Sequence, residues 1–262
     1  HGQPALDTFT SQVVSEDLDE QPLAARTAAE LGLKQQVVRA EPDDVASLFP
    51  QVVQAADSPV VDPTGGCHLA LTRAVHDAGY KVVVSGEGAD EMFAGYLWFK
   101  AQRAFRLLGA GSQRPSDWVI RKIFHRLHPQ ADAAYYNEMV DALGGMPAQN
   151  YVYMLTSRGR WELLRPEVRE AMGEETAYRQ LNLDTEKMQR WHPLNRSLYF
   201  GTKTHLAGLL LNHRGDRTAM ANSGEARYPF LDERLMEFCM KLPTRWKLRG
   251  LNRDKYLLRQ TA

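Results

Sequence analysis

The sequence predicts an α/β protein, with a parallel sheet and helical crossovers in its first part and a largely helical C-terminal portion. Two observations support this prediction. Up to about residue 96, short apolar segments rich in β-branched residues alternate with amphipathic segments, whereas from residue 97 onward apolar residues recur at helical spacing. We therefore expect an α/β part at residues 1–96 and a mainly helical part at residues 97–262.

The first elements follow the order strand, helix, strand. Residues 5–14 and 34–41 are expected to be strands. Residues 21–31 carry apolar side chains at helical spacing and are followed by Gly32, which suits a helix C-terminus. This order is typical of a helical crossover between parallel strands.

Two further helices are expected before the next strand. Asp43 and Asp44 are candidate caps for a helix at residues 44–57, which Pro50 should kink or divide. Residues 63–79 predict a turn and a second helix. Strand and helix therefore alternate up to the next apolar run.

Residues 80–84 form a short apolar run with three successive valines and no polar alternation. This pattern is typical of a strand that is buried on both faces of a parallel sheet. From residue 97 onward, helical segments are separated by Gly and Pro. The expected helices cover residues 97–110, 116–128, 132–143, 148–164 and 196–212.

Charge and cysteine content narrow the functional classes. The 262 residues include 32 Lys and Arg and 32 Asp and Glu, so no net field would draw the chain to nucleic acid or to a membrane surface. Cys67 and Cys239 lie far apart, so we expect buried, reduced thiols rather than a zinc site or a redox pair. An apolar run of about 18 residues and a signal-peptide pattern are both absent, which favours a cytoplasmic protein.

The stretch at residues 85–91 directly follows the apolar run. Ligands bind beyond the carboxyl ends of strands in open α/β sheets, and Gly86 and Gly88 would let the backbone approach a nucleotide closely. The stretch also carries three carboxylates, which need a metal ion, an ammonium or a basic side chain to balance them. Taken alone, it is equally compatible with ordinary capping of a helix N-terminus by acidic residues.

Three segments of the chain resemble motifs of asparagine synthetases. Residues 85–96, SGEGADEMFAGY, are similar to SGEG(A/S)DE(L/V)FGGY. Residues 221–243 are similar to (A)xSxE(A/V)RxPFLD followed by an amphipathic helix and LP, and residues 254–259, DKYLLR, are similar to K(Y/H)(L/I)LR. Order and spacing agree as well, so the chain resembles this family from about residue 5 to its end.

The resemblance implies a synthetase domain of the adenine nucleotide α-hydrolase (PP-loop) type. In this family the domain activates aspartate with ATP and Mg²⁺ as β-aspartyl-AMP, and ammonia from an N-terminal glutaminase domain then gives asparagine. The glutaminase domain and the SGGxDS pyrophosphate loop lie outside residues 1–262, with the loop expected just upstream of residue 1. We therefore expect residues 1–262 alone to be inactive, and the resemblance leaves room for a homodimer.

The resemblance also assigns candidate roles to individual residues. Ser85 and Gly86 match positions that hold ATP, and Glu87 matches the base that takes a proton as ammonia attacks the acyl-adenylate. Asp90 matches an acid that binds Mg²⁺ together with pyrophosphate, a role that suits a hard oxygen ligand. Lys255 is a candidate contact to the ATP phosphates, and the alternative is an ordinary solvated lysine.

The acceptor site is assigned less directly. Glu91, Arg217 and Arg227 are candidate substrate-binding residues, with Arg227 as a bidentate partner for a substrate carboxylate. Alternatively, the charged residues of the second block form internal salt bridges. These residues are Asp216, Arg217, Glu225, Arg227 and Asp232.

Two departures from the family pattern stand out. Ala94 replaces a frequent glycine, and Ser11 with Gln12 replace an apolar residue and a glycine that often follow the second strand. The second departure could change how adenine is held.

Asparagine synthesis is the first functional hypothesis. The second is an amidotransferase that acts on another carboxylate, of a polysaccharide, a peptide or a secondary metabolite. Retention of Glu87 argues against the ring-closing relatives, which use a tyrosine-based base. A third hypothesis is an inactive scaffold of the same fold, against which the intact Glu87, Asp90 and Lys255 argue.

Overall fold

The computed structural model describes residues 6–14, 19–60, 62–107, 139–150, 153, 163–172 and 178–261. The chain forms two compact units, which are described separately. The first unit comprises His1–Glu87 and Thr204–Pro229, and the second comprises Gly88–Lys203 and Phe230–Ala262. A later segment of the chain, Thr204–Pro229, thus returns to the first unit.

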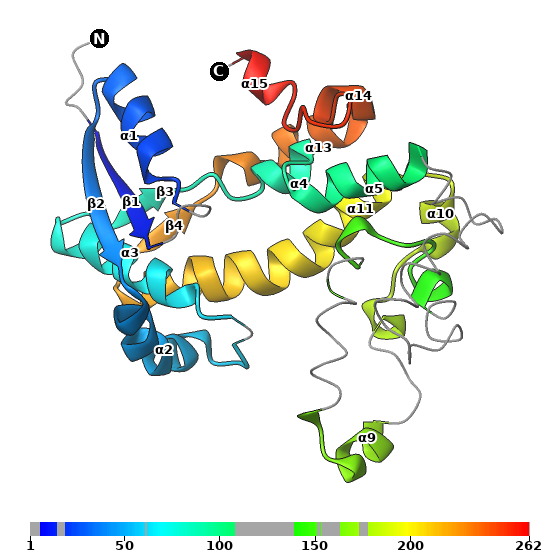
Figure 1. Cartoon of the computed structure of the whole chain (residues 1–262), viewed down its shortest axis with the longest axis horizontal. Coiled ribbons are helices and arrows are strands. Elements are labelled where there is room, and N and C mark those ends of the chain that lie inside the picture. The colour runs from blue at the N-terminus through cyan, green and yellow to red at the C-terminus, as the bar shows by residue number, and fades with distance from the viewer. Residues whose placement is uncertain are drawn as a thin grey trace. The chain divides into compact units, whose positions relative to one another are not determined.

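The first unit carries every strand of the described chain, and Figure 1 shows its elements. The segment Thr202–Asp216 is a π-helix that begins two residues before this unit. The elements are β1 (Asp7–Val13), α1 (Gln21–Glu30), β2 (Lys34–Ala40), α2 (Pro42–Ala56), α3 (Gly65–Asp77), β3 (Val82–Val84), η3 (Thr202–Asp216), α12 (Arg217–Ala221) and β4 (Glu225–Arg227).

Strands β1 and β2 form a parallel pair, with Asp7 opposite Lys34 and Val13 opposite Ala40. Helix α1 connects them and packs against both, as does α3. The two predicted strands and the crossover helix between them are therefore confirmed. Ser11 and Gln12, the residues that depart from the family pattern, lie in β1 opposite Val38 and Arg39.

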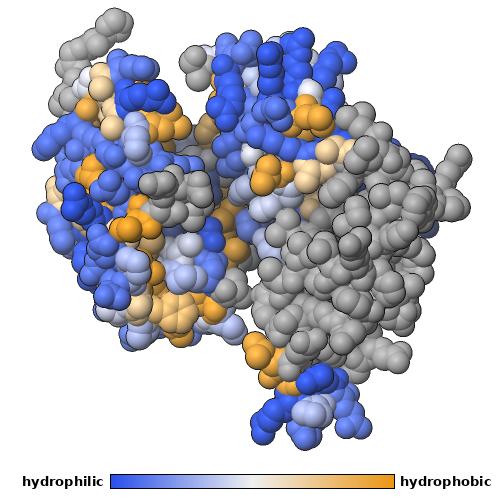
Figure 2. Space-filling view, in the orientation of Figure 1, coloured by the Kyte–Doolittle hydropathy of each residue, from blue (hydrophilic) through white to orange (hydrophobic). Residues whose placement is uncertain are grey.

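Strands β3 and β4 form a second parallel pair, with Val82 opposite Glu225 and Val84 opposite Arg227. The expectation that residues 80–84 are buried on both faces is wrong. Val82 is 39% exposed and Val84 is 66% exposed, because β3 has only three residues and a single partner strand within the described chain. Figure 2 shows such apolar side chains, in orange, at the surface of the part that carries the strands.

Helix α2 corrects two predictions. Pro50 lies inside it, yet the helix runs undivided from Pro42 to Ala56. Its N-cap residue is Glu41, so Asp43 and Asp44 are not caps but lie in the first turn. Carboxylates are favourable there because they face the positive end of the helix dipole.

Within its described residues the second unit contains helices and no named strand, as expected for the C-terminal portion. The helix predicted at 97–110 is confirmed over residues 97–107, and that predicted at 196–212 is confirmed as the end of an α-helix and part of the π-helix that continues into the first unit. Of the helices predicted at 132–143 and 148–164, residues 139–142 and 148–150 are described and helical, while the segment 116–128 lies outside the described residues. The elements are α4 (Ala89–Phe93), α5 (Leu97–Leu107), α9 (Pro166–Met172), η2 (Arg179–Leu181), α10 (Thr185–Gln189), α11 (Pro193–Gly201), η4 (Pro229–Leu231), α13 (Glu233–Lys241), α14 (Thr244–Lys247) and α15 (Leu258–Thr261).

The core of the second unit anchors the short helix α4. Met92 and Phe93 pack with Cys239 of α13, and the rings of Phe93 and Phe230 meet edge to face at 6.3 Å. Cys239 is a buried, free thiol as predicted, whereas Cys67 in the first unit is free but only partly buried. None of the helices in the described ranges is long and apolar enough to cross a membrane.

Asp232 of the PFLD sequence caps helix α13. Its Oδ1 accepts hydrogen bonds from the backbone N–H groups of Arg234, at 3.0 Å, and Leu235, at 3.2 Å. An unsatisfied N–H at a helix N-terminus is costly, so this aspartate has a structural role.

We predict that Asp232→Ala lowers the free energy of unfolding by about 1 kcal/mol, because the first turn of α13 loses its cap. Urea unfolding would measure the change. Glu237→Ala on the exposed face of the same helix serves as the control and should change stability by less than about 0.5 kcal/mol. Equal effects of the two substitutions would contradict the capping role.

Candidate functional site

The β3–β4 ladder aligns two of the segments singled out in the sequence. The N–H of Ser85 donates to the carbonyl oxygen of Arg227 at 2.9 Å, one step beyond the last paired residues of the strands. Residues 85–87 and 227–229 therefore leave the carboxyl ends of neighbouring parallel strands together. Ligands of α/β proteins bind at such ends.

Gly86 offers open space at this position. A Cβ atom added there would meet no heavy atom within 4 Å outside its own chain neighbours. The backbone at Gly86 is thus open to close approach by a ligand.

Tyr228 and Asp216 stand beside this segment in the first unit. The Tyr228 hydroxyl donates to Asp216 Oδ1 at 2.9 Å. Burial, this hydrogen bond and the negative charges of Asp216 and Glu87 all raise the pKa of the Tyr228 hydroxyl far above its usual value. The Glu87 carboxylate therefore lies close enough to Tyr228 to act on it electrostatically, and the phenol stays protonated at neutral pH.

Gly88 begins the second unit, where the backbone turns into α4. Its φ is 92°, and an added Cβ would collide with the side chain of Leu231. Glycine is required here for both reasons. The next turn buries Glu91, which is 2% exposed and accepts a hydrogen bond from the Tyr96 hydroxyl at 2.8 Å. This buried position favours a structural role for Glu91 over contact with a substrate.

Asp90 and Lys255 are brought together in the second unit, although 165 residues separate them in the sequence. Lys255 Nζ lies 2.9 Å from Asp90 Oδ1 and 3.0 Å from Oδ2. Its backbone N–H donates to the carbonyl oxygen of Phe93 at 3.0 Å, and its φ is 46°, a left-handed conformation. Lys255 is therefore a positioned partner of Asp90 and not a freely solvated lysine.

Two small residues make room for this ion pair. An added Cβ at Gly95 would collide with the Asp90 carboxylate and the Lys255 side chain, so both would have to shift. Ala94, which replaces a frequent glycine of the family pattern, adopts φ 58° and is fully buried. The preference for glycine at this position follows from that left-handed backbone.

Arg217 and Arg227 lie at exposed positions of the first unit. Arg227 Nε contacts Glu225 Oε1 at 2.8 Å within β4, and both side chains are about 60% exposed. Arg217 Nε donates to Asn212 Oδ1 at 3.2 Å. The alternative prediction of internal salt bridges is confirmed only for the exposed Arg227–Glu225 pair. Asp216 instead accepts a hydrogen bond from Tyr228, and Asp232 caps a helix.

A polar cluster in the first unit was missed by the sequence analysis. Arg214 Nη2 contacts Asp62 Oδ2 at 2.9 Å, and Ser58 Oγ lies 2.9 Å from His213 Nε2. Burial, followed by the charge of Arg214, lowers the pKa of His68 to about 4, and the same causes lower that of His205 to about 4. Sequence spacing could not reveal this cluster, because it joins two segments, residues 58–68 and 205–214, that are more than 130 residues apart in the sequence.

Lys247 is a second unpredicted feature, in the second unit. It is buried, and its Nζ lies 3.3 Å from Asn195 Oδ1. Burial lowers the pKa of its ammonium group to about 8. An isolated lysine in a sequence gives no sign of such burial.

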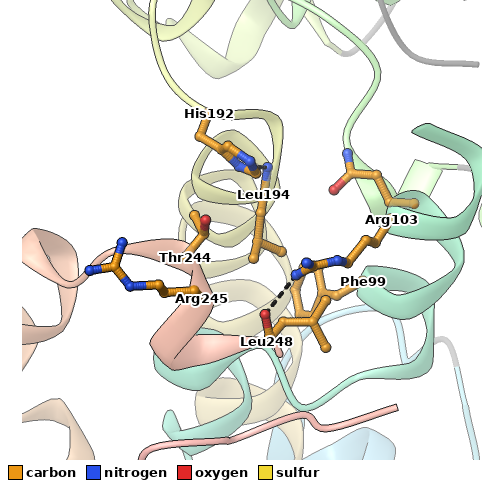
Figure 3. A pocket seen from close by; sticks show the side chains of 8 residues that line it. Phe99, Arg103, His192, Leu194, Thr244, Arg245 and Leu248 are labelled. Carbon is orange, nitrogen blue, oxygen red and sulfur yellow. Dashed lines mark hydrogen bonds between the residues drawn. The ribbon is translucent and has the colours of Figure 1, made fainter. Parts of the chain in front are cut away.

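The second unit also contains a cavity of about 260 Å³, shown in Figure 3. Arg103 from α5 crosses toward Leu248 and donates to its carbonyl oxygen at 2.7 Å. None of the residues predicted to act on ATP lines this cavity. The lining residues are Phe99, Gln102, Arg103, His192, Leu194, Thr244, Arg245 and Leu248.

Comparison with known proteins agrees with the aligned motifs. The family model described as asparagine synthase matches residues 1–262. The chain belongs to the asparagine synthase family. Family membership confirms the resemblance predicted from residues 85–96, 221–243 and 254–259 and indicates an enzyme of the ligase or amidotransferase type.

The relatives include proteins with different names. Amidase chyE of Penicillium rubens is 32% identical over 270 residues, which cover 93% of this chain and 38% of the relative. Amidase chry2 of Gibberella zeae is 27% identical, and the aligned region covers 90% of this chain and 37% of the relative. The glutamine-hydrolysing asparagine synthetase 1 of Bacillus subtilis is 26% identical, and the aligned region covers 99% of this chain and 40% of the relative. The chain thus spans about two fifths of the length of these family members.

We predict that Gly95→Ala displaces the Asp90 and Lys255 side chains from each other and lowers the free energy of unfolding by up to about 1 kcal/mol, the contribution of a partly exposed ion pair. The urea midpoint of the intact protein would measure this. Gly208→Ala is the matched control, because a Cβ there meets nothing within 4 Å. Equal midpoints for Gly95→Ala and the parent protein would contradict the packing of the pair.

We also predict that acid destabilises the first unit. The folded pKa of His68 and of His205 is about 4, below the ordinary value of 6.5, so the unfolded chain binds more protons between these values. Stability contributed by the neutral histidines is complete above pH 6.5 and is lost as the pH falls toward 4. Each histidine adds a slope of up to about 1.4 kcal/mol per pH unit.

Urea unfolding between pH 7.5 and 5 would measure this slope. The double variant His68→Asn/His205→Asn should flatten it. His76→Asn, on the same helix as His68, leaves both shifted groups in place and should keep it. A parent protein whose stability is constant over this range would show that the two histidines are not buried in neutral form.

Proposed function

We propose that the chain is the amide-forming part of an ATP-dependent synthetase. It would activate a carboxylate by adenylation and then let ammonia displace AMP. The observation that carries this proposal is the Ser85–Arg227 backbone hydrogen bond at 2.9 Å, which sets two family motifs side by side at the carboxyl ends of parallel strands. The parallel pairs and the crossover helix α1 support a fold of the adenine nucleotide α-hydrolase type.

The residues of β3 and the following turn fit a nucleotide. Open space at Gly86 allows close approach to the backbone, and Ser85 can offer its hydroxyl to a phosphate or ribose oxygen. ATP would supply the adenylate that makes the carboxylate reactive. We assign Ser85 and Gly86 to holding it.

Asp90 and Lys255 fit the pyrophosphate end of ATP with Mg²⁺. Asp90 offers a hard oxygen ligand, and magnesium in proteins is commonly held by one or two carboxylates with substrate phosphates and water. Phosphate oxygens and water would complete the coordination. Lys255 would then turn from Asp90 to the phosphates and balance their charge.

Glu87 is assigned as the base of the amination step. Ammonia attacks the acyl carbon of the adenylate, a C–N bond forms, and the C–O bond to AMP breaks. The nitrogen becomes cationic during this attack, so a carboxylate beside it stabilises the charge and takes the proton. Glu87 follows β3 after Ser85 and Gly86, and its charge helps to raise the pKa of Tyr228. Because Tyr228 therefore stays protonated at neutral pH, it cannot serve as the base.

Aspartate is the proposed acceptor, which would make asparagine the product, and a glutaminase domain such as the family carries would deliver the ammonia. A second candidate is another carboxylate of a peptide, polysaccharide or secondary metabolite. The greater identity to a protein named amidase, 32%, than to the Bacillus subtilis asparagine synthetase, 26%, favours this candidate.

The test is an assay of the intact protein that contains this chain, with ATP, Mg²⁺, aspartate and ammonia. AMP, pyrophosphate and asparagine are measured. Glu87→Gln should reduce amide formation by about 10²–10⁴-fold while preserving aspartate-dependent exchange of pyrophosphate into ATP. Glu237→Gln, at an exposed site of α13, is the matched control and should keep full activity.

The outcomes separate the hypotheses. Full activity of Glu87→Gln would contradict the assignment of the base. Formation of AMP with another carboxylate but not with aspartate would select the second candidate. Absence of AMP with every carboxylate would leave the inactive scaffold.

A further inference from the structure

We propose that Tyr228, held by Asp216, is a specificity residue that accepts a hydrogen bond from the attacking amine beside Glu87. This inference rests on the proposed amide-forming function and deepens it. It concerns the recognition of the nitrogen nucleophile, whereas the roles assigned above concern ATP and proton transfer.

The orientation of the Tyr228 hydroxyl is fixed by its partner. The hydroxyl donates its single proton to Asp216 Oδ1 at 2.9 Å. A phenol oxygen that has committed its proton can only accept further hydrogen bonds. Tyr228 therefore presents lone pairs, which suit a donor such as the N–H of ammonia or of a primary amine.

Gly215 allows this orientation. A Cβ atom on Gly215 would collide with the Tyr228 hydroxyl. The absence of a side chain at the residue directly before Asp216 thus lets the phenol reach the carboxylate. Arg217, on the other side of Asp216, directs its Nε to Asn212 instead.

The backbone places Tyr228 next to the segment that carries Glu87. The β3–β4 register, continued by the Ser85–Arg227 hydrogen bond, sets Tyr228 at the carboxyl end of β4 beside residues 85–87. The negative charge of Glu87 contributes to the raised pKa of the Tyr228 hydroxyl. In the proposal, an amine bound beside Glu87 meets the carboxylate as one acceptor and the Tyr228 oxygen as another.

Glu87 and Tyr228 differ in acidity and can therefore have different roles toward the amine. Glu87 can take a proton from the nitrogen, whereas Tyr228 remains a neutral phenol that orients a second N–H. The nitrogen lone pair is then left to face the acyl carbon. Tyr228 also occupies the x position of the pattern (A)xSxE(A/V)RxPFLD, which the family motif does not restrict, so a specificity role is compatible with family membership.

The test uses Tyr228→Phe in the intact protein, which removes the hydroxyl and keeps the ring. The KM for ammonia should rise about tenfold, the effect of one lost hydrogen bond, while carboxylate-dependent exchange of pyrophosphate into ATP stays within about twofold. Tyr80→Phe is the matched control, because the Tyr80 hydroxyl also donates to an aspartate, Asp7 Oδ2 at 3.1 Å, elsewhere in the first unit. It should change neither value.

Asp216→Ala provides a second variant in case Tyr228→Phe does not fold. It frees the hydroxyl to rotate and should also raise the KM for ammonia. An unchanged KM for ammonia with normal exchange would overturn the inference and leave the proposed function intact. Loss of exchange in Tyr228→Phe would overturn it too, because the residue would then belong to adenylation. Absence of exchange in the parent protein would refute the proposed function itself, and the inference would fall with it.

Discussion

The parallel pairing of β3 with β4 is the constraint on which the candidate site depends. Each strand has only three residues, and their partners are more than 140 positions apart along the chain. Such a long-range contact closes a large loop, and its entropic cost must be met by the packing of the elements around it. In the first unit, α12 packs on α2 and α3 and leads directly into β4. The pairing then fixes where residues 85–87 and Tyr228 leave the sheet.

In the second unit, the corresponding constraint is steric. A five-residue helix, α4, enters through a glycine at φ 92° and leaves through an alanine at φ 58°. Short helices have little stability of their own, so the Met92, Phe93 and Cys239 cluster must hold it in place. That packing presents Asp90 to Lys255, and the absence of a side chain at Gly95 leaves room for the two charges to meet.

Sequence patterns predicted the positions of strands and helices better than they predicted the burial and tertiary contacts of the side chains. β1, β2 and α1 follow from alternation of β-branched and amphipathic segments, and the motif resemblance located the residues that the fold brings into contact, such as Asp90 and Lys255. Burial could not be predicted for the valines of β3, because it depends on the number of neighbouring strands rather than on the run itself. The histidine cluster with Arg214, and the Tyr228–Asp216 bond, arise from tertiary contacts that no local pattern contains. The capping role of Asp232, in contrast, has a local signal in the sequence, because an aspartate directly before an amphipathic helix is typical of an N-cap.

The exposed valines of β3 favour self-association of the isolated chain in solution. Among the residues that the structure describes, β3 has a partner strand on one side only. A strand edge without a partner and with apolar side chains is a template for pairing with another molecule, and two such edges can join copies of the same chain. A net charge of zero adds no electrostatic repulsion to oppose this contact. Self-association of residues 1–262 in solution would therefore reflect the open edge of β3 and need not indicate a biological oligomer.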